Sequence, residues 1–274
     1  MERGAGQKII KSLNEILTCG ILLLSFILPS LSNSQSEIGI LKESGTKLLE
    51  AVQSDEIEKV KDLIDKGANV NARAEFGETP LHLAQSKEMA EVLLSKGADI
   101  RAKDDEFGMT PLFNAPKEIF EFLISKGADV NVRSKKGLTP LAWSAYGDDL
   151  DRIKLLITKG ADVNSADEHL KTSLHIAANW NKIEIAKLLI SKGAKVNARD
   201  RSGWIPLHWA SFKGGPEVVQ LLITGGADKN AKTTQPWSIF PAGSTPLDIA
   251  EEAKFYDMAA FLRSKGCRRE EDLR

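Results

Sequence analysis

The sequence predicts an all-α solenoid in which short helical units of about 33 residues stack along one axis. Two recurring features carry this prediction: a glycine that ends the apolar part of each unit, and a motif built around Thr-Pro-Leu that recurs in step with it. A fixed period of roughly 20–50 residues is typical of repeat architectures, in which each unit packs only on its neighbours. The glycines are Gly67, Gly97, Gly127, Gly160, Gly193, Gly226 and Gly266, spaced by 30, 30, 33, 33, 33 and 40 residues.

The N-terminal segment 1–34 is predicted to be a secretory signal peptide. A basic opening precedes an uncharged, mostly apolar stretch at 16–28, and a small polar tract extends from Ser30 to Ser36. This three-part pattern is typical of signal peptides, and the small residues suit cleavage near Asn33 or Gln35. The apolar stretch is shorter than the roughly 20 residues that a membrane-spanning helix needs.

Two other interpretations of this segment remain open. It could be an uncleaved membrane anchor over about residues 16–31, or an apolar helix that packs on the rest of the chain. Because the basic flank is N-terminal, the signal peptide and the anchor would both export the remainder of the chain. We therefore expect a periplasmic or secreted protein, with a membrane-anchored one as the alternative. A linker at 35–45 would lead to a repeat domain at 46–274.

Each unit contains the signals of two helices. Threonine suits the N-cap of the first helix, and proline lacks the N–H that would be unpaired at its first position. Leu81 and Ala84, like their equivalents, share one face of that helix. A second helix with apolar periodicity ends at Lys-Gly, where glycine takes the left-handed conformation. The motif occurs as GETPLHLA (77–84), GMTPLFNA (108–115), GLTPLAWS (137–144), LKTSLHIA (170–177), GWIPLHWA (203–210) and GSTPLDIA (243–250).

Two units are shorter than the others. Thr79 to Gly97 spans 18 residues and Thr110 to Gly127 spans 17, against 21 elsewhere. The missing residues fall between the two helices, so we expect shorter helices or a tighter connection there. Because stacked units are held by their neighbours, the region 77–131 should be the weak joint of the stack.

These motifs, TPLH-x-A followed in register by LL-x-x-GAD-V-N, resemble those of the ankyrin repeat family over about residues 46–274. The resemblance implies an ankyrin repeat solenoid of stacked helix–loop–helix units, with hairpin-like fingers that project at right angles. It also implies a concave face, made of finger tips and first helices, that binds partners. The expected units are about 46–76, 77–107, 108–136, 137–169, 170–202, 203–242 and 243–274.

We expect the binding surface to lie near the fourth to sixth units. The resemblance implies that the residue before Thr-Pro and residues at the end of the first helix face the concave side. Trp204 is interpreted as a partner contact, because exposed tryptophan is enriched at binding hot spots, with packing between fingers as the alternative.

The long finger 231–244 either folds back on the stack or binds a partner. Trp143 and Trp209 are interpreted as mainly core. The predicted protein-binding residues are Trp204, Trp237, Phe240, Phe212, Trp180, Tyr146, Lys171 and Leu138.

Composition and residue order argue against other functional classes. A formal charge of −1, from 37 basic and 38 acidic residues, does not favour nucleic-acid binding by bulk charge. His82, His175 and His208 occupy the same place in their repeats, which indicates a structural role, and no cluster indicates a catalytic or metal site. We expect a non-enzymatic monomer that binds another protein and carries no cofactor or metal. An enzyme or small-ligand sensor is the remote alternative, and membrane contact is expected only if the N-terminal segment is uncleaved.

Overall fold

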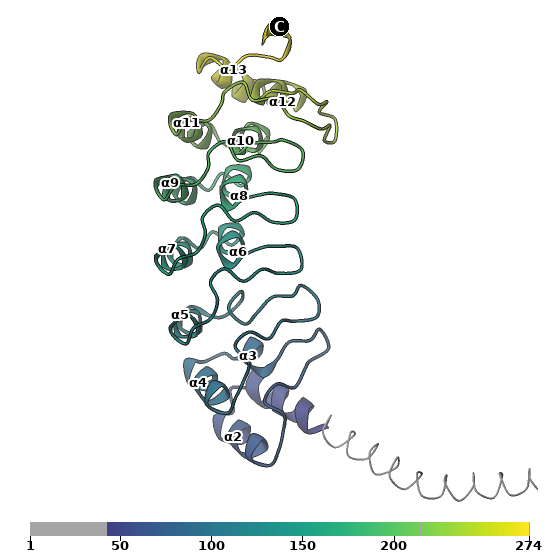
Figure 1. Ribbon diagram of the computed structural model, residues 1–274, viewed down its shortest axis with the longest axis vertical. Helices are drawn as coiled ribbons and strands as arrows, with labels where there is room; N and C mark the ends of the chain where they lie inside the picture. The colour runs from purple at the N-terminus through teal and green to yellow at the C-terminus, as the bar shows by residue number, and fades with distance from the viewer. Residues whose placement is uncertain (1–42, 214, 274) are drawn as a thin grey trace, which may run out of the picture.

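The computed structural model describes residues 43–213 and 215–273, which form one elongated stack of helix pairs (Figure 1). The all-α prediction is confirmed: the β-type pairing in the described residues consists of two isolated bridges, Ala166 with Thr172 and Trp237 with Phe240. No helix in the described part of the chain is long and apolar enough to cross a membrane. The predicted signal peptide, its anchor alternative and most of the linker lie outside the described residues.

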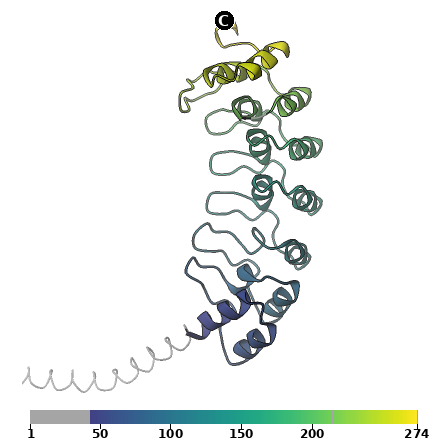
Figure 2. The same cartoon turned by 180° about the vertical axis from the view of Figure 1, so that it is seen from behind.

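The helices stand in two rows. The first helices of the units lie beside the looped fingers, and the second helices form the far row (Figures 1 and 2). We call the side of the stack made by the fingers and the first helices the inner face. The helices are 43–53, α2 (Ile57–Asp65), α3 (Pro80–Leu83), α4 (Lys87–Ser95), α5 (Lys117–Ser125), α6 (Pro140–Tyr146), α7 (Leu150–Thr158), α8 (Ser173–Asn179), α9 (Ile183–Ser191), α10 (Pro206–Lys213), α11 (Pro216–Thr224), α12 (Pro246–Glu252), α13 (Tyr256–Ser264) and the 3-10 turn Glu271–Leu273.

The helices begin and end as the repeated motifs predict. At the start of α6, Thr139 Oγ1 accepts the amide of Ala142 at 3.3 Å, and Pro140 occupies the first helical position. After α7, Gly160 has a φ of 88°, in the left-handed region that other residues rarely adopt. Residues within one unit therefore determine where its first helix begins and where its second helix ends.

Where the repeat carries a histidine, at His82, His175 and His208, that side chain ties its unit to the next one. His175 Nδ1 accepts the amide of Thr172 at 3.1 Å, and its Nε2 donates to the carbonyl of Trp204 in the next finger at 3.1 Å. These bonds use both nitrogens of a neutral imidazole. Burial lowers the pKa of His175 and His208 to about 4, although the nearby Asp200 charge opposes this shift at His175. These contacts give the histidines the structural role that their shared position predicts.

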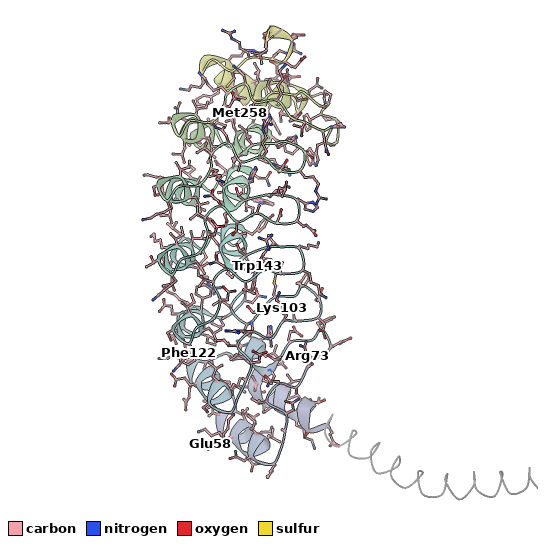
Figure 3. All side chains as sticks on the ribbon, viewed as in Figure 1. Glu58, Arg73, Lys103, Phe122, Trp143 and Met258 are labelled. Atoms are coloured by element: carbon pink, nitrogen blue, oxygen red, sulfur yellow. The ribbon has the colours of Figure 1, made fainter. Side chains whose placement is uncertain are left out.

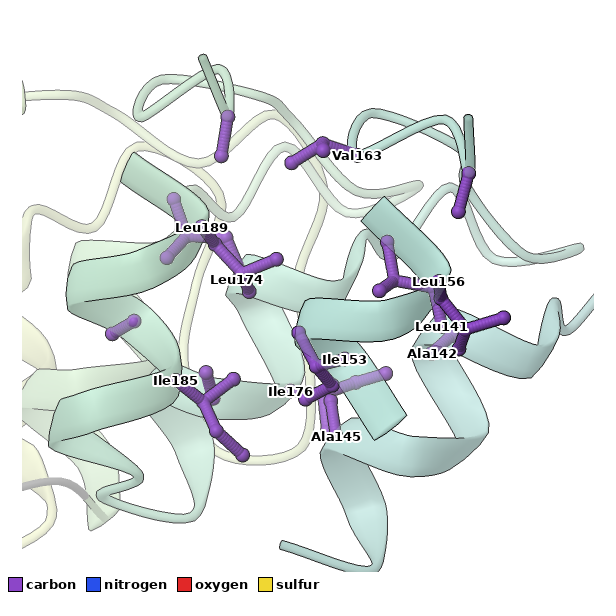
Figure 4. Packing of buried hydrophobic residues seen from close by; sticks show 14 of the residues in the cluster. Leu141, Ala142, Ala145, Ile153, Leu156, Val163, Leu174, Ile176, Ile185 and Leu189 are labelled. Atoms are coloured by element: carbon purple, nitrogen blue, oxygen red, sulfur yellow. The ribbon is translucent and has the colours of Figure 1, made fainter. Parts of the chain in front are cut away.

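A continuous apolar core lies between the two rows. Leu141 and Ala145 of α6 pack in it with Ile153 and Leu156 of α7, and the next unit repeats the arrangement (Figure 4). Complete burial of a leucine side chain contributes about 1.5–3 kcal/mol. Because every unit presents the same two faces, each unit covers the apolar face of one neighbour, and its own second apolar face is covered by the next unit.

The two short units lose part or all of their first helix, as expected. In the first of them α3 has four residues, and in the second residues 111–114 form a turn without a helix. Arg152 of the adjoining unit donates to the carbonyl oxygens of Phe113 and Ala115 beside this turn. Its guanidinium also lies 4.7 Å from the ring centroid of the buried Phe120. A neighbour therefore supplies contacts where the helix is missing.

Basic side chains link neighbouring fingers through backbone carbonyls. Arg73 donates to the carbonyls of Gly77 and Lys103, each at 3.0 Å, and Lys103 Nζ donates to the Arg133 carbonyl at 2.7 Å (Figure 3). Arg199 repeats this pattern further along the stack, where it donates to the Lys232 carbonyl at 2.8 Å. Some of the arginine and lysine side chains thus hold neighbouring fingers together.

Candidate functional site

Trp204 packs inside the stack. Its side chain is 1% exposed, and its ring centroid lies 4.8 Å from that of Trp209, 5.0 Å from that of Trp237 and 5.6 Å from that of Phe240. The prediction of Trp204 as an exposed partner contact is therefore wrong, and the alternative of packing between fingers holds. The cause is the long finger 231–244, whose aromatic side chains cover the tryptophan from the next unit.

The long finger folds back on the stack. The amide of Trp237 donates to the Phe240 carbonyl at 2.9 Å, the amide of Phe240 donates to the Trp237 carbonyl at 3.0 Å, and the two rings are parallel within 2°. Phe240 is 2% exposed, so its predicted partner contact is also wrong. Trp237 is half-buried, and Ile239 at the turn is the well-exposed member of these three large apolar side chains. Each aromatic pair adds about 0.5–1.5 kcal/mol to the burial of its rings.

The remaining predicted residues stay accessible to different degrees. Tyr146 is 41% exposed at the end of α6, and Trp180 is 54% exposed directly after α8. Lys171, Leu138 and Phe212 are half-buried. The interpretation of Trp209 as core is confirmed by its burial, whereas Trp143 is half-buried and donates its Nε1 proton to Asn114 Oδ1 at 3.0 Å.

A hollow of about 210 Å³ lies where three fingers meet α10, and we call it the finger pocket. Lys171 Nζ lies 3.9 Å from the ring centroid of Trp209, within the range of a cation–π contact. Arg201 donates to the Glu168 carbonyl at 2.7 Å. The pocket therefore joins aromatic faces to two cations. Its lining residues are His169, Lys171, Asp200, Arg201, Ser202, Trp204, Trp209 and Trp237.

Asp200 fixes the geometry of the finger pocket. Its buried carboxylate accepts the amides of Ser202 and Trp204 at 2.9 Å through Oδ1, and the Nε1 proton of Trp209 at 3.0 Å through Oδ2. Such bonds offset the cost of burying the charge. Sequence reasoning missed Asp200, although a signal was present. Other fingers also have a polar residue at this position. Asp167 accepts the amide of Lys171 and Ser134 accepts the amide of Leu138, in each case four residues further along the chain.

A larger hollow, of about 610 Å³, lies between the end of α10 with the first residue of α11 and the segment that joins α12 to α13 with the start of α13. Phe255 and Tyr256 at its edge are 45% and 70% exposed. Sequence reasoning missed this pair. The signal available was two adjacent aromatic residues at the start of the second helix of the last unit, next to the connection where polar residues are expected. The apolar side chains that complete the lining are Phe212, Pro216, Met258 and Phe261.

The chemistry of these surfaces suits binding. The thiol of Cys267 is buried, which raises its pKa to about 11, so it is protonated at neutral pH and a poor nucleophile. No group of three or more His, Cys, Asp and Glu side chains suited to a metal ion occurs in residues 43–213 and 215–273. The inner face offers aromatic rings, isolated charges and backbone groups, the components of a recognition surface.

Comparison with known families agrees with this architecture. Residues 48–133 and 113–200 match the model of three ankyrin repeats, and residues 202–234 match the model of a single ankyrin repeat. Comparison with curated proteins finds no significant match. The matched residues make up more than half of the chain and contain α2 to α11 with the fingers between them. The chain therefore belongs to the ankyrin repeat family.

Proposed function

We propose that this chain is a non-enzymatic protein that binds another protein through its inner face, around the fourth to sixth units. Ankyrin repeats generally bind other proteins, and the family is generally non-enzymatic. One observation supports this location: the exposed Tyr146 and Trp180 and the finger pocket occur on consecutive units of the stack. Aromatic side chains on a rigid frame lose little entropy on binding and dominate many interfaces.

The buried aromatic residues keep an indirect role in this proposal. Trp204 and Phe240 hold the long finger against α10, and this contact sets the position of Trp237 beside Lys171. A binding surface held in one shape before the partner arrives pays less ordering entropy. The buried Trp204 and Phe240 thus hold the binding surface in place. Trp180, Tyr146 and the rim of the finger pocket would contact the partner.

Site-specific photocrosslinking tests the location. A photoreactive amino acid is placed at Tyr146 or Trp180, and in matched controls at the exposed Lys154 or Lys187 of the outer helices α7 and α9. We expect crosslinks to a bound protein from the two inner positions and none above background from the outer ones. Equal crosslinking from both sets, or crosslinks from the outer helices alone, would show that the inner face is not the binding surface.

We also propose that the repeat domain acts outside the cytoplasm, with the segment 1–34 as its export signal. The support is the basic opening, the uncharged stretch at 16–28 and the small residues after it. Sequencing the N-terminus of the mature protein decides between the two modes of export. A start near Asn33 to Gln35 is expected for a secreted or periplasmic protein, whereas an intact N-terminus with membrane fractionation indicates the anchored scaffold.

A further inference from the structure

We propose that the finger pocket binds a carboxylate of the partner, supplied by an aspartate or glutamate side chain in an extended segment. This inference rests on the proposed function, and it names the chemistry that one part of the inner face recognises. Three features of the pocket point to a carboxylate: its two cations, an indole N–H without an acceptor, and its size.

The cations that border the pocket form no ion pair within the described residues. No carboxylate oxygen lies within 4.0 Å of Lys171 Nζ or of the Arg201 guanidinium in residues 43–213 and 215–273. The acidic group of the pocket, Asp200, already accepts three N–H donors. Among the residues that line the pocket, Lys171 and Arg201 carry one positive charge more than Asp200 balances; the Glu168 carboxylate lies outside this lining, 3.5 Å from His169 Nε2. An anion from outside would therefore meet a net attractive charge.

The Nε1 proton of Trp204 has no acceptor. Trp204 lines the pocket, and its indole nitrogen is buried without a hydrogen-bond partner among the described residues. The neighbouring Trp209 differs, because Asp200 Oδ2 accepts its Nε1 proton at 3.0 Å. A buried donor without a partner is unfavourable, and a bond to a carboxylate oxygen would remove that penalty. Because the Trp204 side chain is 1% exposed, this bond requires the rings around Trp204 to shift when the carboxylate enters. A group without a hydrogen-bond acceptor, such as an ammonium or an alkyl group, would leave the Trp204 N–H unpaired.

The dimensions favour one side chain with the chain that carries it. A hollow of about 210 Å³ admits an aspartate or glutamate side chain but no folded element. The rings of Trp209 and Trp237 would cover the methylene groups of that side chain, while Lys171 and Arg201 meet its oxygens. Binding a carboxylate between a cation and an indole N–H gives charge-assisted hydrogen bonds, which are stronger than neutral ones.

The equivalent hollow near the N-terminal end of the stack has the opposite character. It measures about 140 Å³ and includes Glu78, Asp104 and Glu106 in its lining, with Phe76 and Phe107 exposed at its edge. A carboxylate would be repelled there. The same architectural position thus carries acids at one end of the inner face and bases at the other, which makes the selectivity a property of the side chains and not of the fold.

Selection from a random peptide library tests the inference. The full-length chain, residues 1–274, is presented to phage displaying random 12-residue peptides, and the same selection is run with Lys171→Glu. Lys187→Glu is the matched control, because it makes the same charge change at an exposed position of the outer helix α9. We expect peptides enriched in Asp and Glu for the native chain and for Lys187→Glu, and peptides enriched in Lys and Arg for Lys171→Glu.

A double-mutant cycle on one selected peptide sharpens the result. Lys171→Met and the exchange of the peptide's acidic residue for its amide should each weaken binding about tenfold, the loss of one charge-assisted contact. The two changes together should cost little more than either one, because they remove the same interaction. Trp204→Phe, which keeps a ring but removes the N–H, should weaken binding about fivefold by loss of one hydrogen bond.

Several outcomes overturn the inference. Selected peptides without acidic enrichment, acidic enrichment that persists in Lys171→Glu, or additive losses in the cycle would each exclude carboxylate recognition by the finger pocket. In those cases peptides whose binding still depends on Trp180 would leave the proposed function standing. A failure to select any peptide dependent on the inner face would remove both. If Lys171→Glu fails to fold, the cycle with Lys171→Met decides, because that variant keeps the apolar stem over Trp209.

Discussion

The units at 77–136 and the units at 170–242 begin and end with the same signals but fold differently. The first pair has 17 or 18 residues from the threonine position to the closing glycine, and the second pair has 21. The short units form only a four-residue α3 and the turn at 111–114, whereas α8 has seven residues and α10 has eight. Capping motifs therefore place the boundaries, and the length between them decides whether a helix can form.

The two regions also differ in how they are held together. Buried histidines tie units five and six to the units that follow them: His175 bonds to the Trp204 carbonyl and His208 to the Ser244 carbonyl. In unit three Phe113 occupies the histidine position, and Arg152 reaches across from unit four. The difference shows that a stack can keep its continuity with different contacts at each joint, because each interface is a separate nearest-neighbour interaction.

Acid should weaken the histidine-tied units and so reverse the order of stability. Well above pH 6.5, the unfolded value, His175 and His208 are neutral in both the folded and the unfolded chain, and their contribution to stability does not change with pH. Between pH 6.5 and their folded pKa of about 4 the unfolded chain binds protons that the folded chain does not, so stability falls as pH falls. The loss should reach up to about 3 kcal/mol for each histidine. Urea denaturation between pH 7.5 and 4.5 measures it.

The physical reason is burial, which lowers the pKa of His175, and a proton on Nδ1 would also face the amide of Thr172 whose hydrogen bond Nδ1 now accepts. His82 has a lowered pKa for the same reason, burial, but units three and four have Phe113 and Ala142 in that position. On acidification, the protection factors of amides, corrected for the intrinsic exchange rate at each pH, should therefore fall most in α8 and α10. Stability that stays flat from pH 7 to 5 would contradict the assigned role of the histidines.

At neutral pH the short units should open more readily than the long ones. The amides of residues 81–83 in α3 and of residues 112–114 should exchange roughly 100-fold faster than those in the middle of α8 and α10, since exchange reports the free energy of local opening. Hydrogen exchange followed by mass spectrometry gives the comparison, corrected for the intrinsic rate of each amide. If the slowest amides of the protein lie in 77–131, the weak joint is elsewhere.

Replacing Arg152 should open the joint between units three and four. Arg152→Met keeps the apolar stem but removes the bonds to the carbonyls of Phe113 and Ala115, at a cost of about 2 kcal/mol. Lys154→Met is the control, because Lys154 is exposed and its change should stay within about 0.5 kcal/mol. Urea denaturation measures both, and equal effects of the two variants would mean that the arginine does not bridge the units.

The smallest expected effect separates two tryptophans of the long-finger region. Trp204→Phe and Trp209→Phe remove the same atoms, but only Trp209 has a bonded Nε1, on Asp200. Trp209→Phe should therefore be less stable than Trp204→Phe by about 1–2 kcal/mol, since it leaves a buried carboxylate short of a donor. Thermal unfolding of the two variants at pH 7.5 tests this. The opposite order would show that packing of Trp204, and not the hydrogen bond, dominates.

Local patterns predicted most of the fold but only part of the binding site. The caps at Thr139 and Gly160 and the burial of Leu174 depend on residues within one unit, so the sequence revealed them. Trp204 and Phe240 were assigned to a partner because large apolar residues appeared at positions expected to be exposed. Their actual neighbours come from different units, and repeat spacing alone does not show which finger covers which.

The sequence by itself therefore determined the period, the starts and ends of the helices, the short units at 77–131 and the structural place of the histidines, because these depend on capping and on contacts that recur in every unit. Only the tertiary structure decided that the long finger covers Trp204, that Asp200 organises the finger pocket and that Arg152 spans the missing helix. The physical reason is the distance along the chain. These contacts join residues about 9–39 positions apart, through a finger of irregular length or across a helix that failed to form.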